Sequence, residues 1–232
     1  MPKLFIALDF ARAAEAKELV NSLEGLTGFG FKVGLQLFLA EGREIMPFLA
    51  ARGYPLFLDL KFNDIPNTVA GALNSVREYA PCMVNLHILA GPDCLRRAAE
   101  TVSGWTRQPL LIGVTLLTSL AAADITALGF GPGTLAEHVV RLARIGHDAG
   151  LHGVVCANHE VRAIKRQVGE DFLTITPGIR IHTAGSDQKR VATIDEARAS
   201  GTDYIVVGRA ITRSADPAKT VAQIMPTLEA FS

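Results

Sequence analysis

Residues 55–69 of this chain read PLFLDLKFNDIPNTV, an apolar run that ends in Asp59, Lys61 and Asp64. Side chains alternate between the two faces of a strand, so Phe57, Asp59 and Lys61 are predicted to share one face and the intervening leucines the other. Helices should cover the leucine face. The opposite face carries charges into the interior end of a sheet, where an unpaired charge is costly. This stretch therefore predicts a buried strand whose charged end has partner groups, a ligand or both.

Short apolar runs like this one recur along the whole chain, and segments of helical periodicity lie between them. One of these segments opens with Thr193 and Glu196 at the spacing of a capping box. The predicted helices include residues 11–26, 41–53, 133–150 and 193–201. Eight runs are predicted to be strands: residues 4–9, 30–35, 56–61, 83–88, 110–117, 153–157, 173–177 and 204–208.

Eight strand–helix units in 232 residues favour an α/β fold of the (β/α)8 TIM-barrel type, built as a single domain over residues 1–232. The alternative is an open doubly wound sheet. Such a sheet usually has fewer strands and often carries a glycine fingerprint after its first strand, where this chain reads LDFAR. No linker or low-complexity tract divides the sequence.

The charge balance and the cysteines narrow the class of protein. Lys plus Arg and Asp plus Glu each number 23, so the formal net charge is zero. Nucleic-acid and membrane-surface proteins usually show a basic excess, and no apolar run approaches the ~18 residues that a membrane span needs. The N-terminus does not read as a signal peptide, and Cys82, Cys94 and Cys156 lack CxxC spacing. We therefore expect a cytoplasmic protein with free thiols, no nucleic-acid partner and no membrane association.

Polar residues lie at or just beyond the ends of seven predicted strands, whose first halves are almost wholly apolar. The active site of such a barrel is built at the carboxyl ends of its strands, so these residues are predicted to converge on one rim. They are Asp9, Lys32, Asp59, Lys61, Asp64, Asn85, His87, Thr118, Ser119, Arg180 and Arg209.

Alternating charge is the main feature of this predicted rim. Asp59, Lys61 and Asp64 follow one strand, and Lys32 and Asp9 follow its neighbours. Carboxylates beside lysines keep them cationic, which suits a lysine that acts as a general acid and stabilises negative charge. A structural ion-pair network is the other interpretation. Three carboxylates also suggest a magnesium site, but the two lysines would compete with the cation, so no metal site is predicted.

Two further residues on the strands are ambiguous. His87 is a possible ligand or acid, although a lone strand histidine is more often a hydrogen-bonded core residue. Cys156 is expected to serve packing alone.

The last two predicted strands lead into a candidate phosphate site. Residues 176–190, TPGIRIHTAGSDQKR, are long for a loop, and VVGRAIT follows at residues 206–212. Loops at these places in such barrels commonly bind phosphate through backbone N–H groups. Gly208 would permit close approach of the backbone, while Arg180 and Arg209 would supply donors. A surface loop with stray arginines is the alternative.

The chain closely resembles the orotidine 5′-phosphate decarboxylase family. The matching motifs run in family order and are ALD at 7–9, FKVG at 31–34, FLDLKFNDIPNTV at 57–69, TLLTS at 115–119, TPGIR at 176–180, Asp-Gln at 187–188 and VGRAIT at 207–212. The motif of the fourth strand, LHILAGPD at 86–93, is less typical. The resemblance implies conversion of orotidine 5′-monophosphate to uridine 5′-monophosphate and CO2, the last step of de novo pyrimidine synthesis, without any cofactor.

The resemblance also implies roles for individual residues. In the family, the residue matching Lys61 protonates C6 of the pyrimidine, the one matching Asp59 lies near the substrate carboxylate, and Lys32 completes the charge chain. Asp59 then acts either by straining the bound substrate or by orienting Lys61. Asp64 and Thr68 are expected to enter the site of a partner subunit, which makes the protein a homodimer with shared active sites. The remaining substrate contacts implied are Asp9 and Lys32 at the ribose, Thr118 with Ser119 at the pyrimidine edge, and Arg180, Gln188, Gly208 and Arg209 at the phosphate.

Two other functions stay open at this point. Sister barrels with the same Asp-x-Lys-x-x-Asp strand, the keto-gulonate-phosphate decarboxylases and hexulose-phosphate synthases, act on sugar phosphates with magnesium. Lys32 and the PGIR segment argue against that interpretation. A non-enzymatic nucleotide-binding barrel is the other possibility, and the intact Asp59, Lys61 and Asp64 argue against it.

Overall fold

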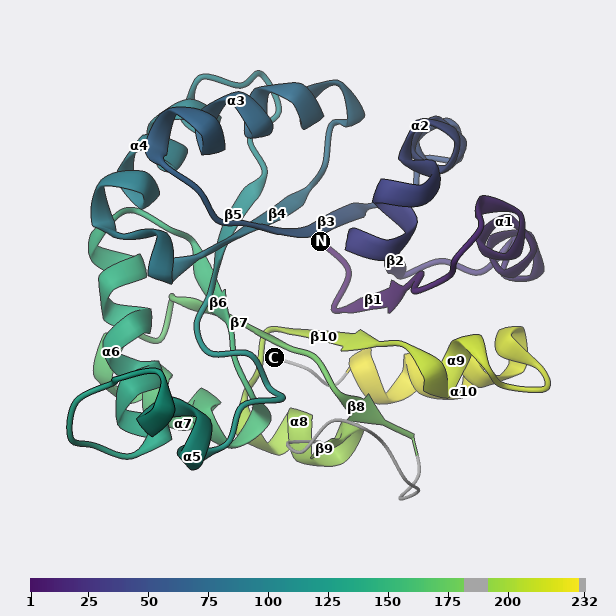
Figure 1. Ribbon diagram of the computed structural model, residues 1–232. Coiled ribbons are helices and arrows are strands. Elements are labelled where there is room, and N and C mark those ends of the chain that lie inside the picture. The colour runs from purple at the N-terminus through teal and green to yellow at the C-terminus, as the bar shows by residue number, and fades with distance from the viewer. Residues whose placement is uncertain (182–191, 230–232) are drawn as a thin grey trace.

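Eight parallel strands form a closed barrel in the computed structural model, which describes residues 1–181 and 192–229. Figure 1 shows the helices arranged around these strands, with α3 and α4 at the top, α6 at the left and α10 at the lower right. The predicted (β/α)8 barrel is thus confirmed. Its strands are β1 Leu4–Ala7, β2 Phe29–Gly34, β3 Leu56–Phe62, β4 Met83–His87, β5 Leu110–Val114, β6 Gly153–Val155, β7 Leu173–Thr176 and β10 Tyr204–Val207.

The helices follow the strands in the order that the barrel requires. They are α1 Ala13–Ser22, α2 Leu35–Ala51, α3 Pro66–Val76, α4 Pro92–Ser103, α5 Ala122–Ala127, α6 Leu135–Asp148, α7 Val161–Val168, α8 Ile194–Ser200, α9 Arg209–Thr212 and α10 Pro217–Glu229. Within the described ranges, three short 3-10 helices accompany them: η1 Arg77–Tyr79, η2 Ile88–Ala90 and η3 Asn158–Glu160. No helix within the described residues is long and apolar enough to cross a membrane.

The strands separate two apolar cores, which agrees with the predicted faces of the stretch at 55–69. Phe57 packs inside the barrel with side chains of the other strands, among them Phe5, Met83 and Ile112. Its neighbour Leu58 packs outside, between the barrel and the helices. The inner core fills the barrel below the rim, so the rim is the place where polar side chains can gather.

Several element ends differ from the sequence prediction. β1 and β5 stop at Ala7 and Val114, so the polar residues after them stand on loops. α2 begins at Leu35 and contains a kink at Glu41, where φ is −147°. The Glu41 carboxylate accepts the Ala13 N–H at the start of α1. Thr193 does cap α8 through the predicted box with Glu196, because each accepts the other's backbone N–H.

The segment after β7 contains two short strands that the sequence did not predict. Ile179–Arg180, β8, pairs in parallel with Ala192–Thr193, β9, as a separate two-stranded sheet. Two-residue strands carry too little periodicity to be read from a sequence. This small sheet fixes Arg180 beside the start of α8.

The close approach of β6 and β7 gives a test of the packing. A Cβ at Gly153 would overlap the carbonyl oxygen of Leu173, its register partner, so the strands would have to separate. Gly153→Ala should therefore lower the free energy of unfolding by about 2 kcal/mol, as overpacking does. Urea unfolding followed by circular dichroism measures the change. A Cβ at Gly104 would have its nearest neighbouring atom 3.8 Å away, so Gly104→Ala is the matched control and should stay within about 0.5 kcal/mol. Equal stabilities of the two variants would contradict the prediction.

Candidate active site

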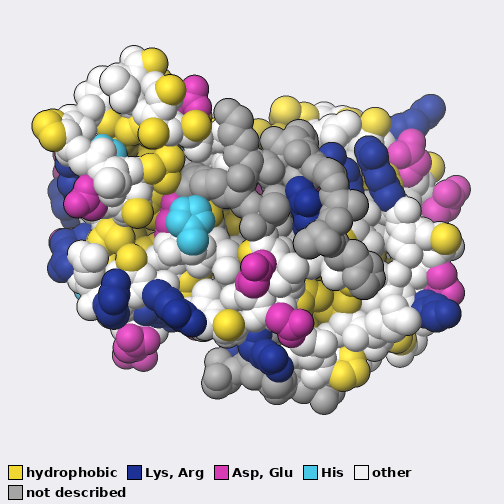
Figure 2. Space-filling view, turned by 90° about the horizontal axis from the view of Figure 1, so that it is seen from below, with side chains coloured by type: hydrophobic (Ala, Val, Ile, Leu, Met, Phe, Trp, Pro, Cys, Tyr) yellow, Lys and Arg dark blue, Asp and Glu magenta, His cyan; other side chains and the backbone are white. Residues whose placement is uncertain are grey.

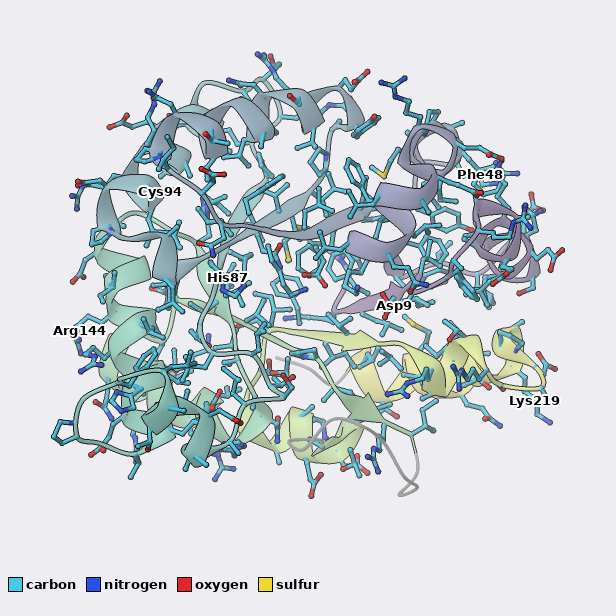
Figure 3. The ribbon with its side chains drawn as sticks, in the orientation of Figure 1. Asp9, Phe48, His87, Cys94, Arg144 and Lys219 are labelled. Carbon is cyan, nitrogen blue, oxygen red and sulfur yellow. The ribbon has the colours of Figure 1, made fainter. Side chains whose placement is uncertain are left out.

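A cavity of about 1260 Å³ opens at the carboxyl ends of the barrel strands. Its floor is formed by inward side chains of the inner core, including Phe57, Ile175 and Val206. Figure 3 shows Asp9 at the end of β1, between that strand and α9. Eight residues predicted for the site line this one cavity: Asp9, Lys32, Asp59, Lys61, Thr118, Arg180, Gly208 and Arg209.

Four of these side chains form a continuous chain of alternating charge. The Lys32 Nζ lies 3.0 Å from Asp9 Oδ1 and 3.1 Å from Asp59 Oδ2. The Lys61 Nζ lies 2.6 Å from the other oxygen of Asp59, Oδ1. Both carboxylate oxygens of Asp59 are therefore in contact with an ammonium group. The order Asp9, Lys32, Asp59, Lys61 is the alternation that the sequence predicted.

Burial and charge act in opposite directions at the centre of this chain. Burial alone would lower the pKa of Lys32, but the Asp59 and Asp9 carboxylates outweigh it and hold the pKa above 10.5. Burial would likewise raise the pKa of Asp59, but Lys32 and Lys61 hold it below 3.8. Asp59 and Lys32 are therefore both charged at neutral pH. Only 13% of the Asp59 side chain and 9% of the Lys32 side chain are exposed, so each charge depends on its partners.

Lys61 has an unusual backbone conformation at the end of β3. Its φ is +50°, in the left-handed region, which costs a residue with a side chain ~1–2 kcal/mol. The β3–β4 register changes here, because β3 advances from Leu58 to Phe62 while β4 advances only from Val84 to Leu86. This irregularity carries Lys61 out of the regular ladder. Strained residues held in place by their surroundings are typical of functional sites.

The neighbouring strand supplies the group that accepts the displaced Lys61 N–H. Asn85 of β4 is fully buried, and its Oδ1 accepts a hydrogen bond from the backbone N–H of Lys61, at 2.8 Å from the backbone nitrogen. The amide nitrogen of Asn85 donates to Asp59 Oδ1 at 2.7 Å. The sequence placed Asn85 on the rim but did not assign it to the site. Asn85 lies two positions after Met83, so both side chains point into the barrel, and a polar residue at such a position was the signal that could have indicated its role.

The two residues predicted to enter a partner's site lie outside this cavity. Asp64 and Thr68 are exposed, and neither lines the cavity of its own chain. The Asp64 carboxylate accepts the N–H of Ile65 at 2.6 Å, and its carbonyl lies 3.4 Å from the Cys94 thiol of α4. Asp64 forms no salt bridge with any residue that the structure describes. Its carboxylate is thus held at the surface beside the start of α3.

The candidate phosphate residues are assembled in part. Arg180 of β8 and Arg209 at the start of α9 line the same cavity, as do Gly208 and Thr118. A Cβ at Gly208 would lie 3.8 Å from the Asp9 carboxylate, at the wall of the same cavity. Ser119 is exposed and is not part of the lining. Gln188 lies outside the described residues.

His87 lies at the end of β4, toward the middle of the barrel in Figure 3. Burial and the nearby charge of Lys61 lower its pKa, so the ring is neutral at pH 7. Its buried Nδ1 has no hydrogen-bond partner among the described residues, so the bond expected of a core histidine is not present there. Cys156, by contrast, is buried in the outer core.

The potential metal ligands in the part of the chain that the structure describes are dispersed. Within residues 1–181 and 192–229, no three His, Cys, Asp or Glu side chains are grouped to hold an ion. On the face drawn in Figure 2, acidic and basic side chains are interspersed among apolar ones, in keeping with the equal charge counts.

The chain is similar to known proteins over nearly its whole length. Residues 2–224 match the model of the orotidine 5′-phosphate decarboxylase / HUMPS family. The chain belongs to this family. It is similar to an orotidine 5′-phosphate decarboxylase of Chromobacterium violaceum, with 44% identity over 97% of this chain and 91% of the relative. A protein of the same name from Idiomarina loihiensis is 40% identical over 98% of both chains.

Solved structures of similar proteins agree with the barrel. The crystal structure of orotidine 5′-phosphate decarboxylase from Lactobacillus acidophilus superposes with a TM-score of 0.86 at 30% identity, covering 98% of this chain and 99% of that one. An uncharacterised conserved protein from Geobacillus kaustophilus gives a TM-score of 0.85 at 34% identity, over 97% and 99% of the two chains.

The charge chain gives a prediction about pH that does not depend on any ligand. Because the pKa of Asp59 is lowered from 3.8 on folding, its stabilising contribution is complete above pH 3.8 and is lost as the pH falls through the folded-state pKa. Asp59→Asn removes this titration. As the pH falls below about 4, the free energy of unfolding of the Asp59→Asn variant should decrease less steeply than that of the unchanged chain. The two slopes should differ by up to about 1.4 kcal/mol per pH unit.

Urea unfolding between about pH 5 and pH 3 measures these slopes. Asp171→Asn is the matched control, because Asp171 is an exposed carboxylate that pairs with no described residue. The control should follow the unchanged chain. Identical slopes for Asp59→Asn and the unchanged chain would contradict the prediction.

Proposed function

We propose that this chain decarboxylates orotidine 5′-monophosphate to uridine 5′-monophosphate and CO2, without a cofactor, as the last step of de novo pyrimidine synthesis. The observation that carries the proposal is the contact of Lys61 with Asp59 at the wall of the rim cavity, at 2.6 Å, in a chain of this family. The names of the relatives support the substrate, and the placed cluster supports the chemistry.

The chemistry asks for electrostatic stabilisation close to one carbon atom. Loss of CO2 from C6 leaves an electron pair in the plane of the pyrimidine ring, where the ring's π-system does not delocalise it. A fixed cation beside C6 stabilises that charge, and a proton donor there completes the reaction. Lys61 suits both tasks, because its ammonium faces the cavity and 29% of its side chain is exposed. Asp59 orients this ammonium and lies near the departing carboxylate in the proposed complex.

The remaining lining residues suit the rest of the nucleotide. Asp9 and Lys32 are proposed to face the ribose hydroxyls, and Thr118 the edge of the pyrimidine. Arg180, Gly208, Arg209 and Gln188 are proposed to bind the phosphate, since guanidinium groups and free backbone N–H groups are common phosphate donors. Binding of this remote group helps to hold the substrate in a site that excludes water.

The active unit is proposed to be a homodimer in which Asp64 and Thr68 complete the partner's site. Both residues are exposed and lie outside the cavity of their own chain. Ile65, between them, is 68% exposed. Apolar side chains are also exposed after β2, β4 and β5, namely Leu35, Leu39, Leu89 and Leu117. A gathering of exposed apolar residues on one end of a barrel fits a protein interface.

The magnesium-dependent sister reaction is less well supported by the site. A metal-assisted mechanism needs free carboxylate oxygens, and those of Asp59 both accept from ammonium groups.

Residues 1–232 are proposed to act as one catalytic domain. The three cysteines, each a free thiol, suit a reducing compartment such as the cytoplasm.

The first functional prediction tests the reaction and the role of Lys61 together. The purified chain should consume orotidine 5′-monophosphate, and the ultraviolet absorbance of the substrate measures the rate. This activity should persist after exhaustive chelation with EDTA. Lys61→Ala should lower kcat by at least about 10³-fold, because it removes both the cation and the proton donor. Circular dichroism checks that the variant is folded. A strict requirement for added magnesium would favour the sister reaction, and a near-normal kcat of Lys61→Ala would remove Lys61 from the mechanism.

The second functional prediction tests the shared site. Lys61→Ala and Asp64→Ala should each be severely impaired as homodimers, yet a mixture unfolded and refolded together should regain activity. Random pairing makes about half of the dimers mixed, and one site in each mixed dimer is intact, so roughly one quarter of all sites should recover.

A second mixture is the control for this experiment. Lys61 and Asp59 touch within one chain, so Lys61→Ala refolded with Asp59→Asn leaves every site defective and should recover nothing. No recovery in the first mixture, with mixed dimers confirmed by mass spectrometry, would show that Asp64 serves its own chain.

A further inference from the structure

The buried amide of Asn85 joins the two reactive groups of β3. Its oxygen accepts the Lys61 N–H at 2.8 Å, and its nitrogen donates to Asp59 Oδ1 at 2.7 Å. Asp59 Oδ1 is also the atom that accepts from the Lys61 ammonium. The main chain of Lys61, the Asn85 amide, the Asp59 carboxylate and the Lys61 ammonium therefore close a ring of hydrogen bonds.

This ring falls where the barrel's own hydrogen bonding is irregular. The register of β3 and β4 shifts between Leu58 and Phe62, and Lys61 sits in that interval with φ +50°. Its N–H points to a side chain rather than to a main-chain carbonyl. A side chain at position 85 must accept from this N–H and donate to a carboxylate at the same time. Asparagine offers both functions from one short, planar group.

We propose that Asn85 is a positioning residue for the decarboxylation, holding the left-handed backbone of Lys61 and the carboxylate of Asp59 so that the Lys61 ammonium is fixed at the reacting carbon. The inference rests on the proposed function. Asn85 does not line the cavity, so it acts through Lys61 and Asp59 and not on the substrate.

The first test separates positioning from binding. Asn85→Leu keeps the branch at Cγ in a somewhat larger side chain but removes both hydrogen bonds, and should lower kcat by about 10- to 100-fold while KM changes less than about threefold. Thr174→Val is the matched control, because Thr174 is a fully buried β7 residue that donates to Asp203 at 2.9 Å and does not line the cavity. The control should lose stability and keep its kcat.

The second test uses a carboxyl group in place of the amide. Asn85→Asp keeps the acceptor for the Lys61 N–H, but its ionised form repels Asp59 and has no donor. When it is protonated, the acid regains the donor, so the ratio of its kcat to that of the unchanged chain should rise as the pH falls. The titratable groups that face position 85 are Asp59 and Lys61 from β3, Lys32 beyond Asp59 and His87 on β4, while the register partner on β5 is the apolar Ile112.

The outcomes of these tests are distinct. A chain that is inactive on orotidine 5′-monophosphate before any substitution would overturn the proposed function itself. If the unchanged chain is active, a near-normal kcat of folded Asn85→Leu overturns the positioning role. If Asn85→Leu fails to fold, the pH profile of Asn85→Asp decides. A kcat ratio independent of pH overturns the inference, and a rise toward acid pH supports it.

Discussion

The structure depends on one largely buried carboxylate, that of Asp59, which stays ionised because two ammonium groups contact it and the Asn85 amide donates to it. An unpaired charge at this depth would cost several kcal/mol, so the strands that carry its partners are not free to shift. Lys32 comes from β2 and Lys61 from β3, and the register places Gly34 of β2 opposite Asp59. A Cβ at Gly34 would lie 3.0 Å from the Lys32 Nζ. The glycine thus leaves the room that the ammonium occupies.

A sharp change of polarity along the barrel axis follows from this constraint. Aromatic and aliphatic side chains fill the interior below, where Phe5 and Phe57 pack edge to face with their ring centres 5.7 Å apart. The charge chain begins two residues further along β3. Apolar packing below the cluster keeps water from one side of it, and the cavity admits a ligand from the other. The low dielectric on the packed side strengthens each ion pair.

The sequence predicted the barrel, the faces of β3 and the alternating charges, because each of these follows from periodicity or from a motif. The strand ends at β1 and β5 were less accurate, since hydrogen bonding between neighbours decides where a strand stops. β8 and β9 were missed because two residues carry no period. The bond of Asn85 to Lys61 was missed for another reason. It arises from a register shift between two strands, and a register is a property of the pair and not of either sequence. For Asp64 and Thr68, the fold explains their position at the surface, and their place in a partner's site stays a prediction.

The left-handed backbone at position 61 also restricts which residues mutation can sample there, whatever the chemistry. At φ +50°, β-branched residues are strongly disfavoured, whereas glycine, asparagine and aspartate are tolerated. If the lysine were replaced in a related barrel, those three residues would therefore be expected at this position more often than valine, isoleucine or threonine. The patterns Asp-x-Gly, Asp-x-Asn and Asp-x-Asp at the end of the third barrel strand would then be the expected sign, in related sequences, that the lysine has been lost.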